Sequence, residues 1–141
     1  MSPTNRFKVI TVRLVANSNN EVLLWKRAET EDVFPWCWAI PWGKVEIDWN
    51  EQSWDILEQG VVREIEEEVW IKVSNCRYLS SHYGHNWWEF KIYIAFTADH
   101  VSWVPQALDE TESVEFFTIE DALKLKLAPN IDVLLSQLGL D

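Results

Sequence analysis

Residues 63–71 read Arg-Glu-Ile-Glu-Glu-Glu-Val-Trp-Ile, and they overlap the end of a segment with a regular apolar repeat. This segment runs from Asp55 to Val69, and its apolar residues recur at every fourth position: Leu57, Val61, Ile65 and Val69. Such a repeat places the apolar side chains on one side of an α-helix, where they can face a hydrophobic core. We therefore predict an amphipathic helix over residues 55–69.

Three glutamates share one face of this predicted helix. Glu64, Glu67 and Glu68 stand at positions i, i+3 and i+4, whereas Glu66 points to the opposite side. Like charges at these spacings repel, so something must offset them. One interpretation is a solvated acidic face that Arg63 partly neutralises, and the other is a site for a divalent cation such as Mg²⁺, which prefers carboxylate oxygens. The spacing alone leaves both interpretations open.

A resemblance to a known family favours the metal site. Residues 63–71 resemble the second half of the Nudix box, REUxEExGU with U an aliphatic residue, at every position except Trp70, where the family has Gly. Upstream, Ala39–Glu46 reads Ala-Ile-Pro-Trp-Gly-Lys-Val-Glu and resembles the LPGGKVE loop of the family, with Trp42 for the first Gly. The resemblance extends from Val9 to Leu138. It implies a MutT-like Nudix hydrolase, whose fold is an α/β/α sandwich with a mixed β-sheet.

The loop before the helix departs from the family pattern. Gly43 lies 20 positions before Arg63, which is further than in the family, so an insertion is expected between about Ile47 and Trp54. Asp55 then stands at the position of the family's first Glu. That Glu usually supports the site, and Asp is a shorter carboxylate of the same chemistry.

Tryptophan is unusually frequent in this chain and glycine unusually rare. There are 10 Trp and 4 Gly, although average usage predicts about ten Gly at this length. Four tryptophans stand at family glycine positions: Trp36, Trp42, Trp54 and Trp70. A side chain in the left-handed conformation that glycine adopts at a helix end costs roughly 1–2 kcal/mol. Our hypothesis is that these tryptophans replace glycines of a natural parent, for instance through a codon that one system decodes as Trp and another as Gly. The rival is a natural Trp-rich loop that binds an aromatic base.

The rest of the sequence predicts strands on both sides of the helix. Strands are expected at 7–16, 21–27, 76–83, 88–98 and 114–118, with the first two joined as a hairpin through residues 17–20. A long loop with short extended pieces is expected at 28–54, and further helices at 120–127 and 130–138. This order predicts an α+β domain, and 141 residues with 48% hydrophobic content suffice for one domain over residues 1–141.

The charge of the chain limits the class of ligand. With 12 Lys and Arg against 23 Asp and Glu, the net charge is −11, which argues against a nucleic-acid polymer because cationic side chains bind phosphate backbones. A small anionic nucleotide is compatible if a metal ion mediates its binding. The most apolar uncharged stretch, Val33–Gly43, is too short for a membrane span, and residues 1–8 do not resemble a signal peptide. Two cysteines are too few for a disulfide framework, so we expect a cytoplasmic protein.

The resemblance also implies a mechanism. Nudix enzymes hydrolyse a nucleoside diphosphate linked to another group, with the aid of Mg²⁺ (or Mn²⁺). Matched residue by residue, Glu64, Glu67 and Glu68 would be catalytic metal ligands, with the backbone carbonyl of Gly43 as a further ligand. Arg63 would orient Glu67 and would not contact the substrate.

Further site residues are expected outside the box. The general base is either Glu64 or a glutamate before the last predicted strand, Glu110 or Glu112. Either Arg27 or Lys26 is expected to contact phosphate, and we favour Arg27 because a guanidinium binds phosphate bidentately. Asn130 resembles the Asn with which MutT-like enzymes recognise a purine, although a plain helix N-cap is the simpler interpretation.

These observations lead to one functional expectation and two alternatives. The chain is expected to be a Mg²⁺-dependent pyrophosphohydrolase that acts on a nucleoside triphosphate, with an oxidised purine nucleotide among the candidates. The first alternative is an ADP-ribose or nucleotide-sugar hydrolase. The second is a Nudix-like domain that binds a nucleotide or a protein without turnover, because Trp42 and Trp70 impair the site. A homodimer is left open.

Overall fold

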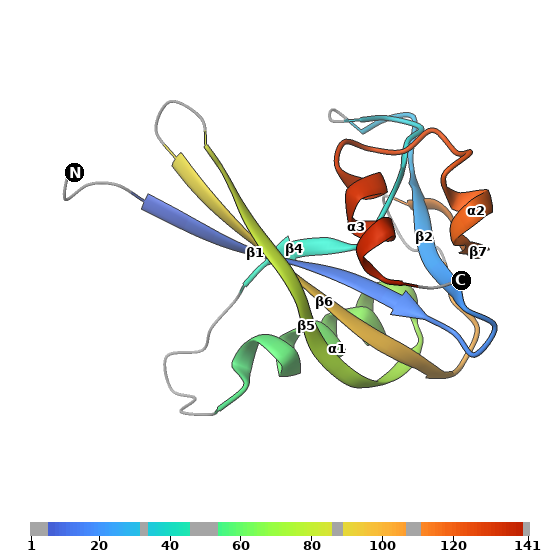
Figure 1. Cartoon of the computed structure of the whole chain (residues 1–141), viewed down its shortest axis with the longest axis horizontal. Coiled ribbons are helices and arrows are strands. Elements are labelled where there is room, and N and C mark those ends of the chain that lie inside the picture. The colour runs from blue at the N-terminus through green and yellow to red at the C-terminus, as the bar shows by residue number, and fades with distance from the viewer. Residues whose placement is uncertain (1–5, 32–33, 46–53, 86–88, 107–110, 140–141) are drawn as a thin grey trace.

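A computed structural model of the chain describes residues 6–31, 34–45, 54–85, 89–106 and 111–139. In chain order, its elements are β1 (Arg6–Ala16), β2 (Glu21–Arg27), β3 (Trp38–Ala39), β4 (Trp42–Lys44), α1 (Ile56–Val69), β5 (Lys72–His85), β6 (Glu89–Ser102), β7 (Thr111–Thr118), α2 (Ile119–Ala122) and α3 (Ile131–Gln137). Figure 1 shows these strands as one strongly twisted sheet.

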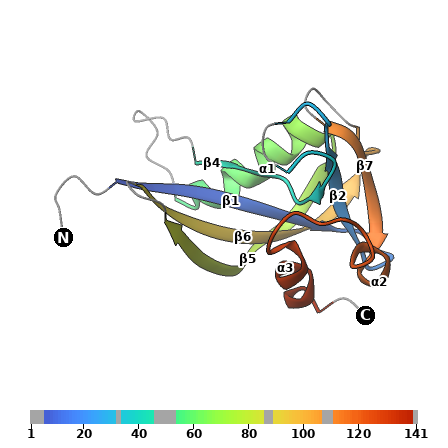
Figure 2. The same cartoon turned by 90° about the horizontal axis from the view of Figure 1, so that it is seen from above.

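The sheet is mixed, as the sequence predicts. β1 runs parallel to β6 from the pair Arg6↔Glu89 to the pair Ala16↔Asp99, and the other pairings in the described sheet are antiparallel. The strand order is β3-β2-β1-β6-β5, with β4 added at β1 and β7 at β2. Helix α1 lies on one side of the sheet, and α2 and α3 lie on the other (Figure 2). The α+β class and the layered arrangement are therefore confirmed.

β1 and β2 form the predicted hairpin, with their pairing limited to the residues next to its turn. The backbone N–H of Asn17 donates to the Glu21 carbonyl at 3.0 Å, and the Asn17 side chain accepts from the N–H groups of Asn19 and Glu21. The only registered pair is Ala16↔Val22, after which β1 pairs with β6 and β4 while β2 pairs with β7. The hairpin is therefore confirmed, and its pairing is short because both strands leave the turn to pair with distant strands, which the turn sequence does not reveal.

The helix predicted at 120–127 is much shorter in the structure. α2 ends at Ala122, and its N-cap is Thr118, whose hydroxyl accepts from the Asp121 N–H at 3.1 Å. The chain that follows is tied to β3: Trp38 N–H donates to the carbonyl of Lys126, and Ala128 N–H donates to the carbonyl of Trp38. This tertiary pairing overrides the local helical tendency. α1 and α3 match their predicted ranges to within one residue at each end.

The side chains of β1 alternate between two apolar clusters. Val12 and Leu14 belong to the cluster that α2 and α3 cover, whereas Val15 belongs to the cluster that includes Ile65 of α1. Because successive side chains of a strand point to opposite faces, Arg13 is directed to the side of the sheet that α1 covers. A charged residue is thereby placed beneath the acidic helix.

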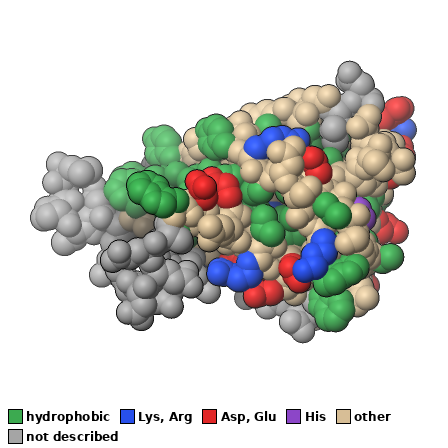
Figure 3. Space-filling view, turned by 90° about the horizontal axis from the view of Figure 1, so that it is seen from below, with side chains coloured by type: hydrophobic (Ala, Val, Ile, Leu, Met, Phe, Trp, Pro, Cys, Tyr) green, Lys and Arg blue, Asp and Glu red, His purple; other side chains and the backbone are tan. Residues whose placement is uncertain are grey.

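The surface carries mixed charge. On the face shown in Figure 3, acidic and basic side chains lie next to one another among hydrophobic ones, so the surplus of acid forms no single patch on that face. In the part of the chain that the structure describes, no helix combines the length and the apolar character needed to cross a membrane.

Cys76 is expected to react slowly with alkylating reagents in the folded protein. Burial raises the pKa of its thiol from 9.0 to about 11, and the Glu58 carboxylate adds to the rise. Because only the thiolate is nucleophilic, two pKa units lower the reactive fraction about 100-fold. Alkylation with iodoacetamide at pH 8, followed by peptide mass spectrometry, should give a rate at Cys76 about two orders of magnitude below that in urea. Equal rates would contradict the buried, unreactive thiol.

Candidate functional site

Helix α1 carries the acidic residues and is anchored by its apolar side. Val61, Ile65 and Val69 are at most 1% exposed and pack against the sheet, as the spacing predicts. This anchoring fixes the rotation of the helix about its axis. Glu64 and Glu68, which lie one turn apart beside the apolar row, are thereby brought to the edge of the helix that faces β1 and β4.

Glu64 and Glu68 meet Arg13 of β1. The Arg13 side chain is 0% exposed. Its Nη1 donates to Glu68 Oε2 at 2.8 Å, its Nη2 donates to Glu64 Oε2, and its Nε donates to Thr11 Oγ1 at 3.4 Å. A buried charge is tolerated when it is paired and hydrogen-bonded. Two carboxylates of α1 therefore share one guanidinium in the interior of the protein.

Gly43 lies against the same guanidinium. It pairs with Thr11 in the β1–β4 ladder. A Cβ at this position would lie 2.6 Å from Arg13 Nη2 and 3.7 Å from Glu64 Oε2, so Arg13, which two carboxylates hold, would have to shift. The absence of a side chain at Gly43 is thus a requirement of space. The structure brings together Gly43, Glu64 and Glu68, as the resemblance implied.

Arg13 itself was missed by the sequence analysis. The signal that could have found it is a single charged residue in the middle of the otherwise apolar and β-branched run Val9–Ala16. A buried arginine in a central strand needs an acidic partner, and the row of box glutamates is the obvious one. Motif matching did not raise the question because Arg13 lies outside both matched stretches.

Burial raises the pKa of the Glu68 carboxyl above its ordinary value. Arg13 opposes this rise, and repulsion from Glu64 and Glu67 adds to it. Because neighbouring carboxylates still repel Glu68 in the presence of Arg13, further positive charge would be favourable at this place.

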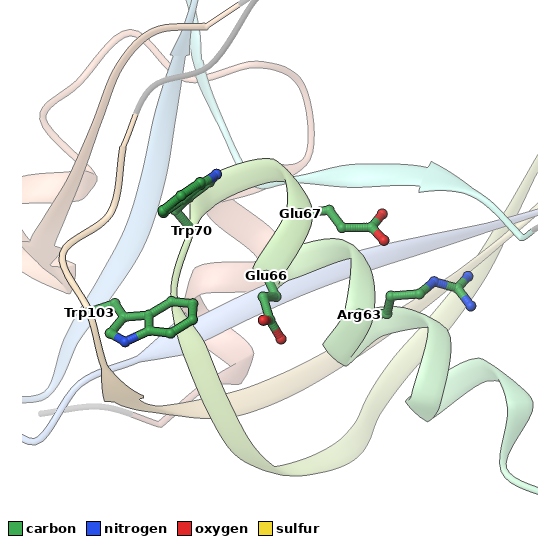
Figure 4. A pocket seen from close by; sticks show the side chains of 5 residues that line it. All are labelled: Arg63, Glu66, Glu67, Trp70 and Trp103. Atoms are coloured by element: carbon green, nitrogen blue, oxygen red, sulfur yellow. The ribbon is translucent and has the colours of Figure 1, made fainter.

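Glu67 and Arg63 lie apart from Arg13. Both are exposed, and in Figure 4 their side chains point away from Trp70. Among the described residues neither forms an ion pair, and no group of three or more His, Cys, Asp or Glu is close enough together to hold a metal. The expected contact between Arg63 and Glu67 is thus not present in this structure. At exposed positions such a pair gains little energy, which offers a physical reason.

A cavity of about 440 Å³ lies beside these residues on α1. It is lined by Arg63, Glu66, Glu67, Trp70 and Trp103, as Figure 4 shows. The rings of Trp70 and Trp103 have their centroids 6.3 Å apart. Lys72 contacts this group, with its Nζ 2.8 Å from Glu66 Oε1 and 4.7 Å from the Trp103 ring centroid.

Three of the described tryptophans have a left-handed backbone. The φ angles are 63° at Trp36, 61° at Trp70 and 71° at Trp103. Trp70 ends α1, where its N–H donates to the Glu66 carbonyl at 3.1 Å. Trp36 and Trp70 are two of the four tryptophans that stand at family glycine positions, whereas Trp42 and Trp54 have no positive φ. Trp103 lies outside the matched motifs. These conformations are the ones that glycine adopts without strain.

Trp42 has an ordinary strand conformation and lies under the guanidinium of Arg27. The distance from Arg27 Cζ to the Trp42 ring centroid is 4.8 Å, and the Arg27 Nη2 lies 3.2 Å from Glu31 Oε2. The Trp42 ring also meets Trp25 edge to face, with the ring centroids 6.4 Å apart. The neighbouring cation, Lys26, lies over the Trp36 ring at 4.4 Å. The arginine expected to contact phosphate is therefore engaged with an aromatic ring.

The remaining predicted residues lie in the other layer and at the sheet edge. Glu112 is exposed on β7, and Glu110 lies outside the described residues. Asn130 precedes α3 with φ 70°, and its side chain makes no capping hydrogen bond. The N-cap interpretation therefore does not account for the Asn130 amide, although asparagine tolerates this backbone conformation better than most residues.

The residues beside Gly43 fit a hard divalent cation. Their donors are carboxylate oxygens of Glu64 and Glu68, with Glu67 on the same helix, and oxygen is the ligand that Mg²⁺ prefers. Because Gly43 has no Cβ, there is room next to Glu64 that a side chain would fill. The Arg13 guanidinium occupies this room in the structure. The two carboxylates beside Gly43 therefore favour a positively charged group.

Comparisons with known proteins agree with this arrangement. A model of the NUDIX domain family matches residues 6–138. A search of curated proteins gives no match. Among solved structures, the chain is similar to a MutT NUDIX hydrolase from Burkholderia pseudomallei, with a TM-score of 0.75 and 25% identity over 96% of this chain and 100% of that chain.

Two further solved structures share the fold. One is the MutT protein from Methanosarcina mazei Go1, with a TM-score of 0.72 and 21% identity over 96% of this chain and 95% of that chain. The other is the NUDIX domain of NrtR from Shewanella oneidensis, solved in complex with ADP ribose, with a TM-score of 0.70 and 21% identity over 98% of this chain and 91% of that chain. The expected sandwich fold is confirmed by these matches.

Proposed function

The chain belongs to the NUDIX domain family, and from this premise we propose that it is a Mg²⁺-dependent (or Mn²⁺-dependent) pyrophosphohydrolase that cleaves a nucleoside diphosphate linked to another group. The observation that carries the proposal is the convergence of Glu64 and Glu68 on one buried cation beside Gly43. These positions are the ones at which the two family motifs match this chain.

Glu64, Glu67 and Glu68 would hold the metal together with the carbonyl of Gly43. When bound, the metal would neutralise negative charge on the phosphate oxygens during attack at phosphorus. The contribution of the protein is to keep the carboxylates in place before the substrate arrives. The apolar side of α1 fixes the helix, and Arg13 holds one oxygen of Glu64 and one of Glu68.

Two further residues act around this centre in the proposal. Arg63 lies one turn before Glu67 on the same side of α1, from which its guanidinium can reach and orient the Glu67 carboxylate. The proton of the attacking water is accepted either by Glu64 or by Glu112. Glu112 is exposed on β7 and forms no ion pair among the described residues, whereas Glu64 is bonded to Arg13. Comparing kcat of Glu64→Gln with kcat of Glu112→Gln distinguishes the two candidates.

For the substrate we propose a nucleoside triphosphate, with an oxidised purine nucleotide as one candidate. Arg27 would bind the phosphates, because its guanidinium lies over Trp42 and keeps its planar face oriented. Asn130 would recognise the base with its side-chain amide, which makes no capping hydrogen bond to α3. The chain would act on this small molecule in the cytoplasm, and we propose no nucleic-acid polymer as its partner.

The direct test is an assay with a panel of nucleotides and Mg²⁺, following the release of phosphate and pyrophosphate. The panel contains ordinary and oxidised nucleoside triphosphates, ADP-ribose and a nucleotide sugar. We expect turnover of a nucleoside triphosphate that stops when EDTA is added. The protein should be assayed beside its Trp42→Gly, Trp70→Gly double variant, because these two tryptophans stand at family glycine positions.

Each outcome of this assay has a distinct meaning. Turnover in the double variant alone would identify an enzyme that the tryptophans impair. Turnover of ADP-ribose alone would replace the proposed substrate, and this alternative is included because one similar domain was solved with ADP ribose. Absence of turnover in both proteins would overturn the proposal in favour of a domain that binds without hydrolysis.

A further inference from the structure

We propose that Arg13 competes with a divalent cation for Glu64 and Glu68, so that the chain supplies the counter-cation of its own metal site. The inference rests on the proposed function for the presence of a metal. It goes beyond that function because the matched motifs assign no role to Arg13. In the metal-free protein the Arg13 guanidinium pairs with both carboxylates, and a bound metal must partly displace it.

The geometry supports competition because Arg13 occupies one carboxylate oxygen of each glutamate. The guanidinium reaches Oε2 of both glutamates, and its Nη2 would lie 2.6 Å from a Cβ at Gly43. Glu64 Oε2 itself would lie 3.7 Å from that Cβ. A cation bound to these Oε2 atoms beside Gly43 would therefore meet the guanidinium. Either the Arg13 hydrogen bonds break, or the carboxylates turn to present their other oxygens.

The electrostatics point the same way. Like charges repel strongly where little water separates them, and the Arg13 side chain is 0% exposed. The Glu64 side chain is 16% exposed and the Glu68 side chain 36%, so solvent screens the group only in part. Arg13 cancels one of the two negative charges it contacts. Its removal would leave both carboxylates available to the metal and would remove a repelling charge beside it.

Arg13 therefore has two opposite effects. It stabilises the metal-free fold, because without it two partly buried carboxylates would face each other unpaired. It also weakens metal binding, because part of the binding energy is used to displace it. A purely structural arginine would show the first effect and not the second, and this difference can be measured.

The test compares the wild-type chain with Arg13→Met and Arg13→Lys by calorimetric titration with Mn²⁺. Methionine keeps the length and apolar stem of the side chain and removes the charge. We expect Arg13→Met to bind Mn²⁺ at least about tenfold more tightly than wild type, with Arg13→Lys in between. The matched control is Arg77→Met, which removes an exposed arginine paired with Asp99 at 3.4 Å and should leave Mn²⁺ affinity unchanged.

Thermal unfolding in EDTA and in Mn²⁺ gives a second readout. The unfolding midpoint of Arg13→Met should fall in EDTA and recover with Mn²⁺ by more than the wild-type midpoint rises. If Arg13→Met does not fold, the wild-type chain decides the question through the side-chain ¹⁵Nε resonance of Arg13. Competition requires that saturating Mg²⁺ shift this resonance, and an unchanged resonance would overturn the proposal.

The outcomes separate this inference from the proposed function. In one outcome, the wild-type protein binds Mn²⁺ and Arg13→Met binds it equally or more weakly. This result overturns the competition and leaves the hydrolase proposal intact. Failure of every variant to bind Mn²⁺ at millimolar concentration overturns both. Tighter binding in Arg13→Met without turnover of any nucleotide supports the competition and contradicts the enzyme.

Discussion

Glu64→Gln is expected to lower kcat for Mg²⁺-dependent nucleotide hydrolysis at least about 100-fold, since groups that support charge at the reacting centre are typically worth this much. The substitution removes a negative charge and keeps the size of the side chain. The glutamine oxygen can still accept from Arg13, whose Nη2 donates to Glu64 Oε2, so the helix should keep its position. The measurement is kcat and KM at saturating Mg²⁺, in whichever form of the protein turns over.

Glu66→Gln is the matched control for this result. Glu66 lies two residues further along α1, and its carboxylate is paired with Lys72 at 2.8 Å on the side that holds the Trp70–Trp103 cavity. The control variant carries the same change in charge on the same helix, and its kcat should stay within about twofold of wild type. A similar loss of kcat in both variants would mean that the charge of the helix as a whole matters. The metal-ligand role of Glu64 would then be abandoned.

The parts of the fold that follow from local pattern were predictable. α1 was found because the apolar row of Val61, Ile65 and Val69 is both periodic and fully buried. The position of Gly43 at the candidate site was predictable because residues 39–46 match a family motif that can be recognised in the sequence itself. The two long strands β5 and β6 were located with ends that differ by up to four residues, since strand ends depend on partners that the sequence does not reveal.

What could not be predicted depends on contacts between distant segments. The pairing of Trp38 with Leu127 shortens α2, and nothing local to residues 120–127 signals it. The meeting of Arg13 with Glu64 and Glu68 joins positions more than 50 residues apart. Trp103 was overlooked because it lies outside the matched motifs, and only its φ of 71° shows that it stands where glycine would be unstrained.

Replacement of Trp36, Trp70 and Trp103 by glycine is expected to give a protein more stable than replacement of the same three residues by alanine, by about 2 kcal/mol in the free energy of unfolding. Both replacements remove the indole, so lost aromatic packing cancels in the comparison. The Cβ of alanine in the left-handed conformation costs roughly 1–2 kcal/mol per residue. The greater backbone entropy that glycine loses on folding offsets about 0.5–1 kcal/mol of this. The three φ angles lie between 61° and 71°. Chemical denaturation of the two triple variants measures the difference.

Trp42 provides the internal control because it lies in β4 without a positive φ. At an ordinary strand position glycine costs about 0.5–1 kcal/mol relative to alanine, so the order of stability should reverse at this residue. A reversal between the two kinds of position would show that the backbone favours glycine at 36, 70 and 103. This result would support the hypothesis of a glycine-containing parent at Trp36 and Trp70 and extend it to Trp103. Alanine equal to glycine at all four positions would contradict that hypothesis, and so would ordinary tryptophan codons in the source gene. If the glycine variants prove more stable than the alanine variants, the end of α1 at Trp70 is strained in this chain. Trp70 lies one turn beyond Glu67, so activity should be sought first in the glycine variants.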